Sequence, residues 1–179
     1  MGFKKWLSAT AASLLLATSL SIAPMQAEET RTIADESIYD LLVDRYFNGS
    51  GQNDVNVNTQ DPTQFAGGDF AGLVSRGENI VELGYTIVSI GPVFAAEKYD
   101  GSLPTSYMEL EPHFGTAEEL TAVIDYFGGK KMEVMVDFPL SNVSANHEWA
   151  ANTDWIASTE NGQIQFDLEN PDVQAALKN

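Results

Sequence analysis

The sequence contains no cysteine and few basic residues, and each shortage excludes a class of function. Without cysteine there are no disulfides, thiolate zinc sites or cysteine nucleophiles. Nine Lys and Arg stand against 26 Asp and Glu, so the formal net charge is −17. Because phosphate binding needs clustered basic side chains, this balance argues against a nucleic-acid partner. The two histidines have no flanking sequence typical of a Ser–His–Asp triad.

The apolar content is sufficient for one folded domain. The chain has 179 residues, of which 44% are apolar and 10% are aromatic. These values are typical of a single globular domain and argue against intrinsic disorder.

The first 27 residues have the pattern of a secretory signal peptide. Lys4 and Lys5 precede an apolar run over residues 6–23, and Ala27 supplies a small residue at the expected cleavage point. The alternative is a membrane anchor, because the run is close to the length that spans a bilayer. We expect cleavage after Ala27, which makes residues 28–179 a secreted, extracellular chain with no membrane partner.

Strand and helix patterns alternate along the rest of the chain. Short apolar runs predict strands at residues 38–44, 86–90 and 132–137, and helical spacing or capping patterns predict helices at residues 70–83, 116–127 and after Asn170. Helix-length crossovers imply an α/β fold with a parallel sheet, and leave an open sheet and a closed barrel as alternatives. No glycine-rich phosphate loop follows the first strand, which argues against a nucleotide site. Asp44 and Asp137 stand at carboxyl ends of strands, where such folds place their chemistry.

Oxygen-bearing side chains gather in the long loop at residues 48–69. Asn48, Asn53 and Asp54 are separated by glycines and small polar residues, and a Gly67-Gly68-Asp69 sequence follows. Calcium binds six to eight oxygens on a flexible loop, which this composition provides, although the spacing is not that of an EF-hand. The alternative is a polar, turn-rich surface loop, and composition alone does not decide between the two.

Two further groups combine polar and aromatic residues. Asp137 is followed by Asn142, His147 and Trp149, a set in which the carboxylate can orient a sugar hydroxyl and the indole can stack on a sugar ring. The alternative is an Asp that accepts backbone hydrogen bonds and a Trp in the core.

The loop between residues 91 and 115 is rich in aromatic side chains, which suits a carbohydrate cleft. For Tyr107 and Phe114, however, packing of the loop onto the sheet is the expected role.

Several motifs occur together in one order. They are Val43-Asp44-Arg45-Tyr46-Phe47-Asn48-Gly49, Gly67-Gly68-Asp69-Phe70-Ala71-Gly72, Leu83-Gly84-Tyr85-Thr86, Gly91-Pro92-Val93-Phe94, Tyr99-Asp100-Gly101, His113-Phe114-Gly115-Thr116 and Val134-Met135-Val136-Asp137. In this order they resemble the opening of bacterial α-amylase-family glycoside hydrolases. The resemblance implies the N-terminal part of a (β/α)8 TIM barrel, with about three βα units within residues 28–179. It also implies cleavage or transfer of α-glucosidic bonds in starch-type α-glucans.

The resemblance further implies a cofactor and a substrate site. Calcium is the expected cofactor, with Asn48, Asn53, Asp54, Asp69 and the carbonyl of Gly67 as ligands. An α-glucan polysaccharide or oligosaccharide is the expected partner, bound by Asp137, Asn142 and Tyr99.

Three departures from the family pattern affect these expectations. Gly101-Ser102-Leu103 stands where the family usually has Gly-Tyr-Trp, so an aromatic sugar platform is missing. Ser141 and Asn142 stand where the family usually has Asn and His; Asn142 can replace the amide ligand of a second, interdomain calcium ion or the histidine, but not both. Gln165 stands where an Asp ligand of that second ion is common.

The family's nucleophile and acid/base residue lie on later strands of the barrel, so we expect no catalytic residue in this chain. A complete barrel needs about 250 residues. The sequence therefore predicts the N-terminal part of a secreted α-amylase-like hydrolase, truncated before the catalytic carboxylates and inactive by itself. A glucanotransferase of the same family and a non-catalytic calcium- or carbohydrate-binding protein remain the alternatives.

Overall fold

The computed structural model describes residues 32–178, and the predicted signal peptide at residues 1–27 lies outside this range. Within residues 32–178, no helix has the length and apolar character needed to cross a membrane. The first element is a short 3-10 helix, η1 (Ile33–Asp35), which precedes the first strand.

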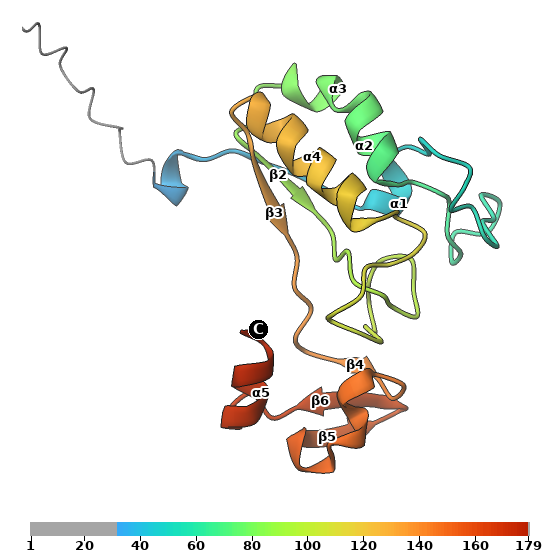
Figure 1. Cartoon of the computed structure of the whole chain (residues 1–179), viewed down its shortest axis with the longest axis vertical. Coiled ribbons are helices and arrows are strands. Elements are labelled where there is room, and N and C mark those ends of the chain that lie inside the picture. Colours follow the sequence, from blue (N-terminus) through green and yellow to red (C-terminus); the bar gives the residue numbers. More distant parts are fainter. Residues whose placement is uncertain (1–31, 179) are drawn as a thin grey trace, which may run out of the picture. The chain divides into compact units, whose positions relative to one another are not determined.

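A three-stranded parallel sheet forms the first layer. It contains β1 (Ile38–Leu41), β2 (Ile87–Ile90) and β3 (Glu133–Val136) in the order β1–β2–β3 (Figure 1). Ile38 lies opposite Ile87, which in turn lies opposite Glu133. The parallel pairing confirms the prediction from the alternating strand and helix patterns.

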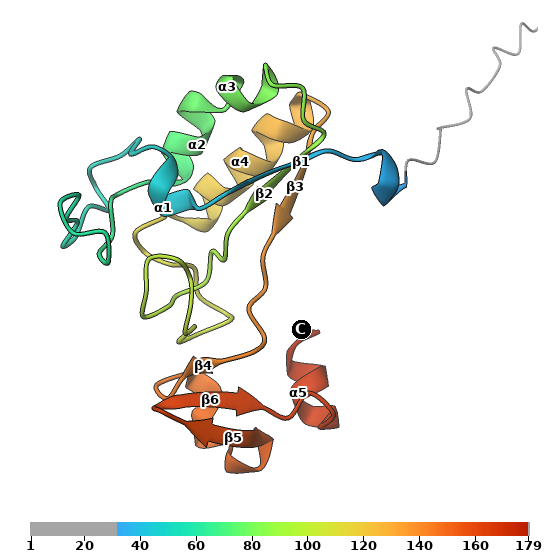
Figure 2. The ribbon, with the colours of Figure 1, turned by 180° about the vertical axis from the view of Figure 1, so that it is seen from behind.

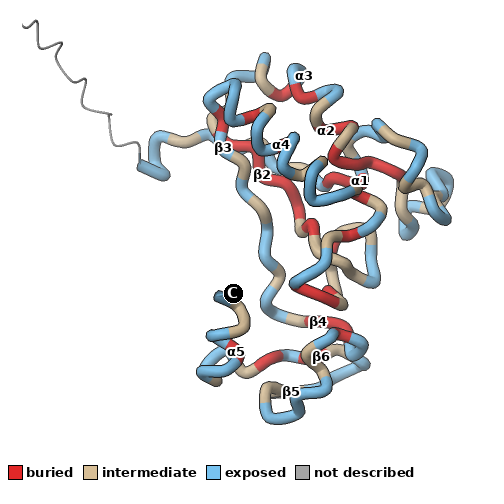
Figure 3. The backbone as a smooth tube through the Cα atoms, in the orientation of Figure 1, coloured by how far each residue is buried: buried red, intermediate tan, exposed pale blue. Residues whose placement is uncertain are grey.

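Helices cover one face of this sheet. α2 (Phe70–Arg76), α3 (Glu78–Val81) and α4 (Ala117–Gly129) lie on the same side, as the two opposite views show (Figures 1 and 2). The apolar core between helices and sheet consists of Val43, Phe70, Leu73, Ile80, Val88, Ile90, Val93, Phe114, Val123, Phe127 and Met132. In Figure 3 the buried positions lie along β2, whose four residues are all buried, and at the start of α2.

Two predicted elements differ from those observed. The strand expected at residues 38–44 ends at Leu41, because the chain turns into a short helix, α1 (Val43–Tyr46), that buries Val43 and Asp44. The helix expected at residues 70–83 is interrupted at Gly77, between α2 and α3. It ends before Gly84, whose φ of +78° favours glycine.

The last part of the chain contains a second sheet that the sequence patterns did not predict. β4 (Val143–Ser144), β6 (Gln163–Phe166) and β5 (Ile156–Glu160) form an antiparallel sheet in the order β4–β6–β5. Two 3-10 helices, η2 (Glu148–Ala151) and η3 (Thr153–Trp155), lie between β4 and β5, and α5 (Pro171–Ala176) follows β6. A separate apolar cluster supports this sheet and consists of Tyr107, Val143, Ile164, Phe166 and Val173.

Candidate functional site

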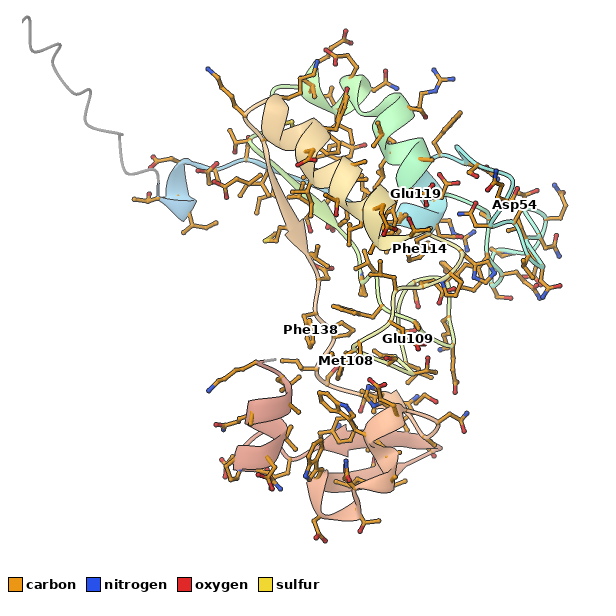
Figure 4. All side chains as sticks on the ribbon, viewed as in Figure 1. Asp54, Met108, Glu109, Phe114, Glu119 and Phe138 are labelled. Atoms are coloured by element: carbon orange, nitrogen blue, oxygen red, sulfur yellow. The ribbon has the colours of Figure 1, made fainter. Side chains whose placement is uncertain are left out.

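The loop after α1 brings three of the predicted calcium ligands together. The Asn48 Nδ2 atom donates hydrogen bonds to both carboxylate oxygens of Asp54, at 2.8 and 2.9 Å. Gly67 lies against the same pair, because a Cβ added to it would lie 2.7 Å from the Asn48 nitrogen and 2.9 Å from an Asp54 oxygen. Its φ of +92° also favours glycine. Figure 4 shows Asp54 in this loop.

The other two predicted ligands lie next to each other, Asp69 as the N-cap of α2 and Asn53 in the loop beside it. Asp69 is 1% exposed and its carboxylate accepts hydrogen bonds from the backbone N–H groups of Gly49 (3.0 Å), Ser50 (2.8 Å) and Gly72 (2.6 Å). The Asn53 Nδ2 atom lies 3.5 Å from the same carboxylate. Asp69 therefore caps α2 and also fixes the beginning of the loop.

The residues present fit a calcium ion. The Asn53 Nδ2 atom donates to the carbonyl of His113 at 2.6 Å, and the Oδ1 atom of Asn53 is buried without a hydrogen-bond partner. A buried oxygen without a partner is costly, and a bound cation or water would satisfy it. Calcium accepts such mixed sets of carboxylate, amide and carbonyl oxygens. Within residues 32–178, no three His, Asp or Glu side chains form a metal-binding group, so an ion bound here would also need the amide and carbonyl oxygens.

Asp44 and Arg45 hold this loop in place, a role that the sequence analysis missed. The buried Asp44 carboxylate accepts hydrogen bonds from the N–H groups of Ala66 and Gly67, and an Arg45 nitrogen lies 3.1 Å from it. Arg45 also donates to the carbonyls of Pro62 and Gln64. Asp44 thus anchors the loop and is not a strand-end group available for chemistry. The sequence feature that could have indicated this anchoring role is the Asp44-Arg45 pair, which directly follows an apolar run.

Tyr99, a predicted substrate contact, packs under Arg45. The guanidinium carbon of Arg45 lies 3.8 Å from the centre of the Tyr99 ring, within the range of cation–π contacts. One ring face is therefore covered by protein. The next residues form a tight turn in which the Asp100 carboxylate accepts hydrogen bonds from the backbone N–H and the hydroxyl of Ser102.

Asp137 follows β3 directly and is exposed, as expected for a strand-end carboxylate. Its backbone N–H donates to the Ile90 carbonyl at 3.2 Å. Asn142 lies beside β4, where its Oδ1 atom accepts a hydrogen bond from Gln165 Nε2 at 3.0 Å. Among residues 32–178, no hydrogen bond joins any two of the predicted substrate contacts Asp137, Asn142 and Tyr99.

The remaining aromatic candidates form a packed cluster. Tyr107 is 7% exposed; its hydroxyl donates to the Pro139 carbonyl, and burial raises its pKa to about 12. His147 is buried between Tyr107, Trp149 and Phe166, and burial lowers the pKa of its imidazole. The packing role expected for Tyr107 is confirmed.

An adjacent cavity of about 230 Å³ is lined by Tyr107, Met108, Phe138, Trp149, Ala176 and Leu177. Figure 4 shows Met108 and Phe138 close together, one from the loop after β2 and the other from the segment after β3. Phe114, the other aromatic expected to pack, is 2% exposed and lies in the main core, which confirms that expectation.

Comparison with known proteins decides the family. The model of the α-amylase catalytic domain matches residues 40–174. The chain belongs to the α-amylase family. Its relatives include α-amylase mde5 of Schizosaccharomyces pombe, which is 27% identical over 140 residues, a match that covers 74% of this chain and 26% of the relative.

Solved α-amylase structures confirm the fold. An α-amylase from Anoxybacillus is 30% identical with a TM-score of 0.76, covering 82% of this chain and 37% of that one. An α-amylase from Geobacillus thermoleovorans, solved with acarbose, is 28% identical with a TM-score of 0.72, covering 82% of this chain and 36% of that one. The parallel βα units are therefore part of a TIM barrel, as predicted. The chain spans about a quarter of the Schizosaccharomyces protein and just over a third of each solved structure.

Proposed function

We propose that this chain forms the N-terminal part of the barrel of a secreted glycosidase that hydrolyses starch-type α-glucans. The family match over residues 40–174 is the observation that supports this function most strongly. The nucleophile and the acid/base residue are expected on strands beyond β3, so no residue here is assigned to bond cleavage. Such enzymes act by retention when their two carboxyl groups lie about 5 Å apart.

In this proposal, the residues after β3 bind sugar rather than cleave it. The exposed carboxylate of Asp137 at the carboxyl end of β3 accepts a hydrogen bond from a sugar hydroxyl. The Asn142 Oδ1 atom already accepts from Gln165, so Asn142 offers its Nδ2 group as a donor. Tyr99, which is partly exposed, would contact sugar with the side of its ring away from Arg45.

The proposal includes one calcium ion in the loop at residues 48–69. Asn48, Asn53, Asp54, Asp69 and the Gly67 carbonyl would hold it, and the unpartnered Asn53 oxygen supports this assignment. Asn48 would bind through its amide oxygen, which requires the amide to turn, since its nitrogen faces Asp54 in this structure. The ion would order the loop by offsetting the repulsion between the two carboxylates, and it would take no part in bond cleavage.

Export of the protein is proposed from residues 1–27 alone. The basic start, the apolar run and the small residue at Ala27 support cleavage after that residue and release into the medium.

The test is an assay of the natural gene product for release of reducing sugars from soluble starch. We expect hydrolysis by that product and its strong reduction by Asp137→Asn, since the carboxylate is lost while the side-chain size is kept. Cyclic products would instead indicate a glucanotransferase.

A gene product that binds maltooligosaccharides without cleaving them would contradict the hydrolase proposal and indicate a carbohydrate-binding protein. A product with neither binding nor cleavage would contradict both functions.

A further inference from the structure

Gln165 occupies the centre of a row of polar side chains across the antiparallel sheet. Val143 of β4 pairs with Ile164 of β6, which places Asn142 opposite Gln165. On the other side, Ser158 of β5 pairs with Gln165. The Gln165 Nε2 atom donates to Asn142 Oδ1 at 3.0 Å, and the Ser158 hydroxyl donates to Gln165 Oε1 at 3.0 Å. Both ends of the Gln165 amide are therefore engaged, one with each neighbouring strand.

This row stands where the family resemblance implies a second, interdomain calcium ion. A hard divalent cation requires several oxygens that point to one centre, usually with two or more carboxylates. The oxygens of Asn142 and Gln165 each accept a cross-strand hydrogen bond, so an ion could bind them only if those bonds broke, whereas the loop at residues 48–69 has the unpartnered Asn53 oxygen. The nearby cavity of about 150 Å³ is lined by Asn142, Ser158, Glu160, Asn161, Gln163 and Gln165, a set with one carboxylate. These residues do not fit the ion.

Direct hydrogen bonds also join this sheet, and the helix η2 that follows β4, to the loop after β2. The buried Ser144 of β4 donates its N–H to the Pro104 carbonyl at 3.0 Å, and the Glu148 N–H donates to the Thr105 carbonyl at 3.0 Å. The Ser144 hydroxyl donates to the carboxylate of Glu97. The junction that an interdomain ion would strengthen is therefore already bonded by protein groups.

We propose that the side-chain row Asn142–Gln165–Ser158 replaces the second calcium ion, so that the β4–β6–β5 sheet is held without metal. Cross-strand hydrogen bonds of this kind stabilise antiparallel pairs. Amide and hydroxyl groups carry no charge, so the row needs no counterion and does not respond to chelators. The inference goes beyond the proposed hydrolase function and is independent of the calcium loop at residues 48–69.

Hydrogen exchange of the full chain, with calcium or with EGTA, tests the proposal directly. We expect any calcium-dependent slowing of exchange at residues 156–166 to be the same in the wild type and in Gln165→Ala. Slowing that occurs in the wild type and vanishes in Gln165→Ala would overturn the proposal, because it would mean that Gln165 helps to bind the ion.

Gln165→Ala also measures how much the row slows hydrogen exchange in the neighbouring strands. Gln165→Ala should speed exchange in β4 and β5 about fivefold or more without calcium, because each lost hydrogen bond contributes a factor of about two to ten. Gln163→Ala is the matched control: it removes the same amide from the same face of β6 but neither bond of the row. Equal exchange in both variants would overturn the proposal.

The amount of calcium that stays bound after gel filtration distinguishes this proposal from the proposed calcium site at residues 48–69. We expect Asp69→Ala to retain none. Retention by Asp69→Ala that is lost in Asp69→Ala/Gln165→Ala would overturn the row proposal. If Asp69→Ala and Asp69→Ala/Gln165→Ala both retain calcium, the result would support the row proposal and contradict the loop site. A wild-type chain that binds no calcium would have the same two consequences.

Discussion

Asp69 combines two roles in one buried carboxylate. It caps α2 through the Gly72 N–H and holds the start of the proposed calcium loop through Gly49 and Ser50. An ion bound beside it would stabilise the native state by mass action, by about 2.7 kcal/mol at a concentration 100 times its Kd. The carboxylate is thus expected to matter both with and without the ion.

We predict that Asp69→Ala abolishes the calcium-dependent rise in Tm. It should also lower stability without calcium by more than the ~1 kcal/mol typical of a lost helix cap, because two further N–H groups lose their acceptor. Thermal unfolding of the longest soluble form, with calcium and with EGTA, measures both effects.

Asp61→Ala serves as the control for this prediction. Its carboxylate lies in the same loop but accepts hydrogen bonds from Thr63, so the calcium response should persist. A wild-type Tm that does not change with calcium would decide against the site.

His147 makes stability depend on pH. Its Nδ1 atom accepts a hydrogen bond from the Trp149 N–H at 3.1 Å, and burial lowers its pKa below the ordinary value of 6.5. Below pH 6.5 the unfolded chain therefore binds a proton on this ring that the native chain does not bind. The stability contributed by the neutral ring is present above that pH and is lost as the pH falls toward the native pKa.

We predict that His147→Asn reduces the fall in Tm between about pH 7.5 and about pH 5.5, since Asn retains an acceptor for Trp149 but does not titrate. Because His113 is unchanged, the difference between the two proteins isolates His147. An equal fall in Tm in both proteins would show that His147 is not responsible.

α4 begins with a reciprocal capping box. The Thr116 hydroxyl accepts the Glu119 N–H at 3.3 Å, and the Glu119 carboxylate accepts the Thr116 N–H at 2.8 Å. This capping box was predicted from the Thr-Ala-Glu-Glu sequence, and the structure confirms it.

Thr116→Ala should cost about 1 kcal/mol and lower Tm by about 3 °C, because the first turn of α4 loses an acceptor. Thr121→Ala, in the interior of the same helix, should leave Tm unchanged or raise it, since alanine has the higher helix propensity. Calorimetry of both variants makes the comparison; a larger loss at Thr121 would contradict the capping argument.

At the scale of the whole molecule, one face of the β1–β2–β3 sheet is left uncovered by the residues that the structure describes. β1 and β3 each pair on one side only within residues 32–178. The face opposite the helices and the segments after the strands expose the large apolar side chains Ile38, Leu42, Met135, Phe138 and Leu140. In a TIM barrel, further strands cover such edges and faces.

We predict that residues 28–179, expressed alone, release no reducing sugar from starch and self-associate through these surfaces. Neither carboxylate needed for retaining hydrolysis is expected among them. Starch assays beside an Asp137→Asn control, together with sedimentation, test both statements. Activity that disappears in the control, or a stable monomer, would contradict the corresponding statement.

Local sequence patterns were sufficient to predict the parallel sheet, the α4 cap, the Asn170 cap of α5 and the strand-end position of Asp137. These features depend on interactions within a few residues or on the alternation of strand and helix, which a sequence records directly.

Tertiary contacts decided the rest. The turn at Leu42 follows from burial of the Asp44 carboxylate under the N–H groups of residues 66 and 67, more than twenty positions away. The β4–β6–β5 sheet was not predicted because β4 has two residues, and because β5 and β6 lack the apolar runs that indicated β1 to β3: β5 continues into Ser158-Thr159-Glu160 and β6 alternates Gln with apolar residues. The amide contact between Asn142 and Gln165 arises from register, and hydrogen-bond partners distant in sequence leave no local pattern.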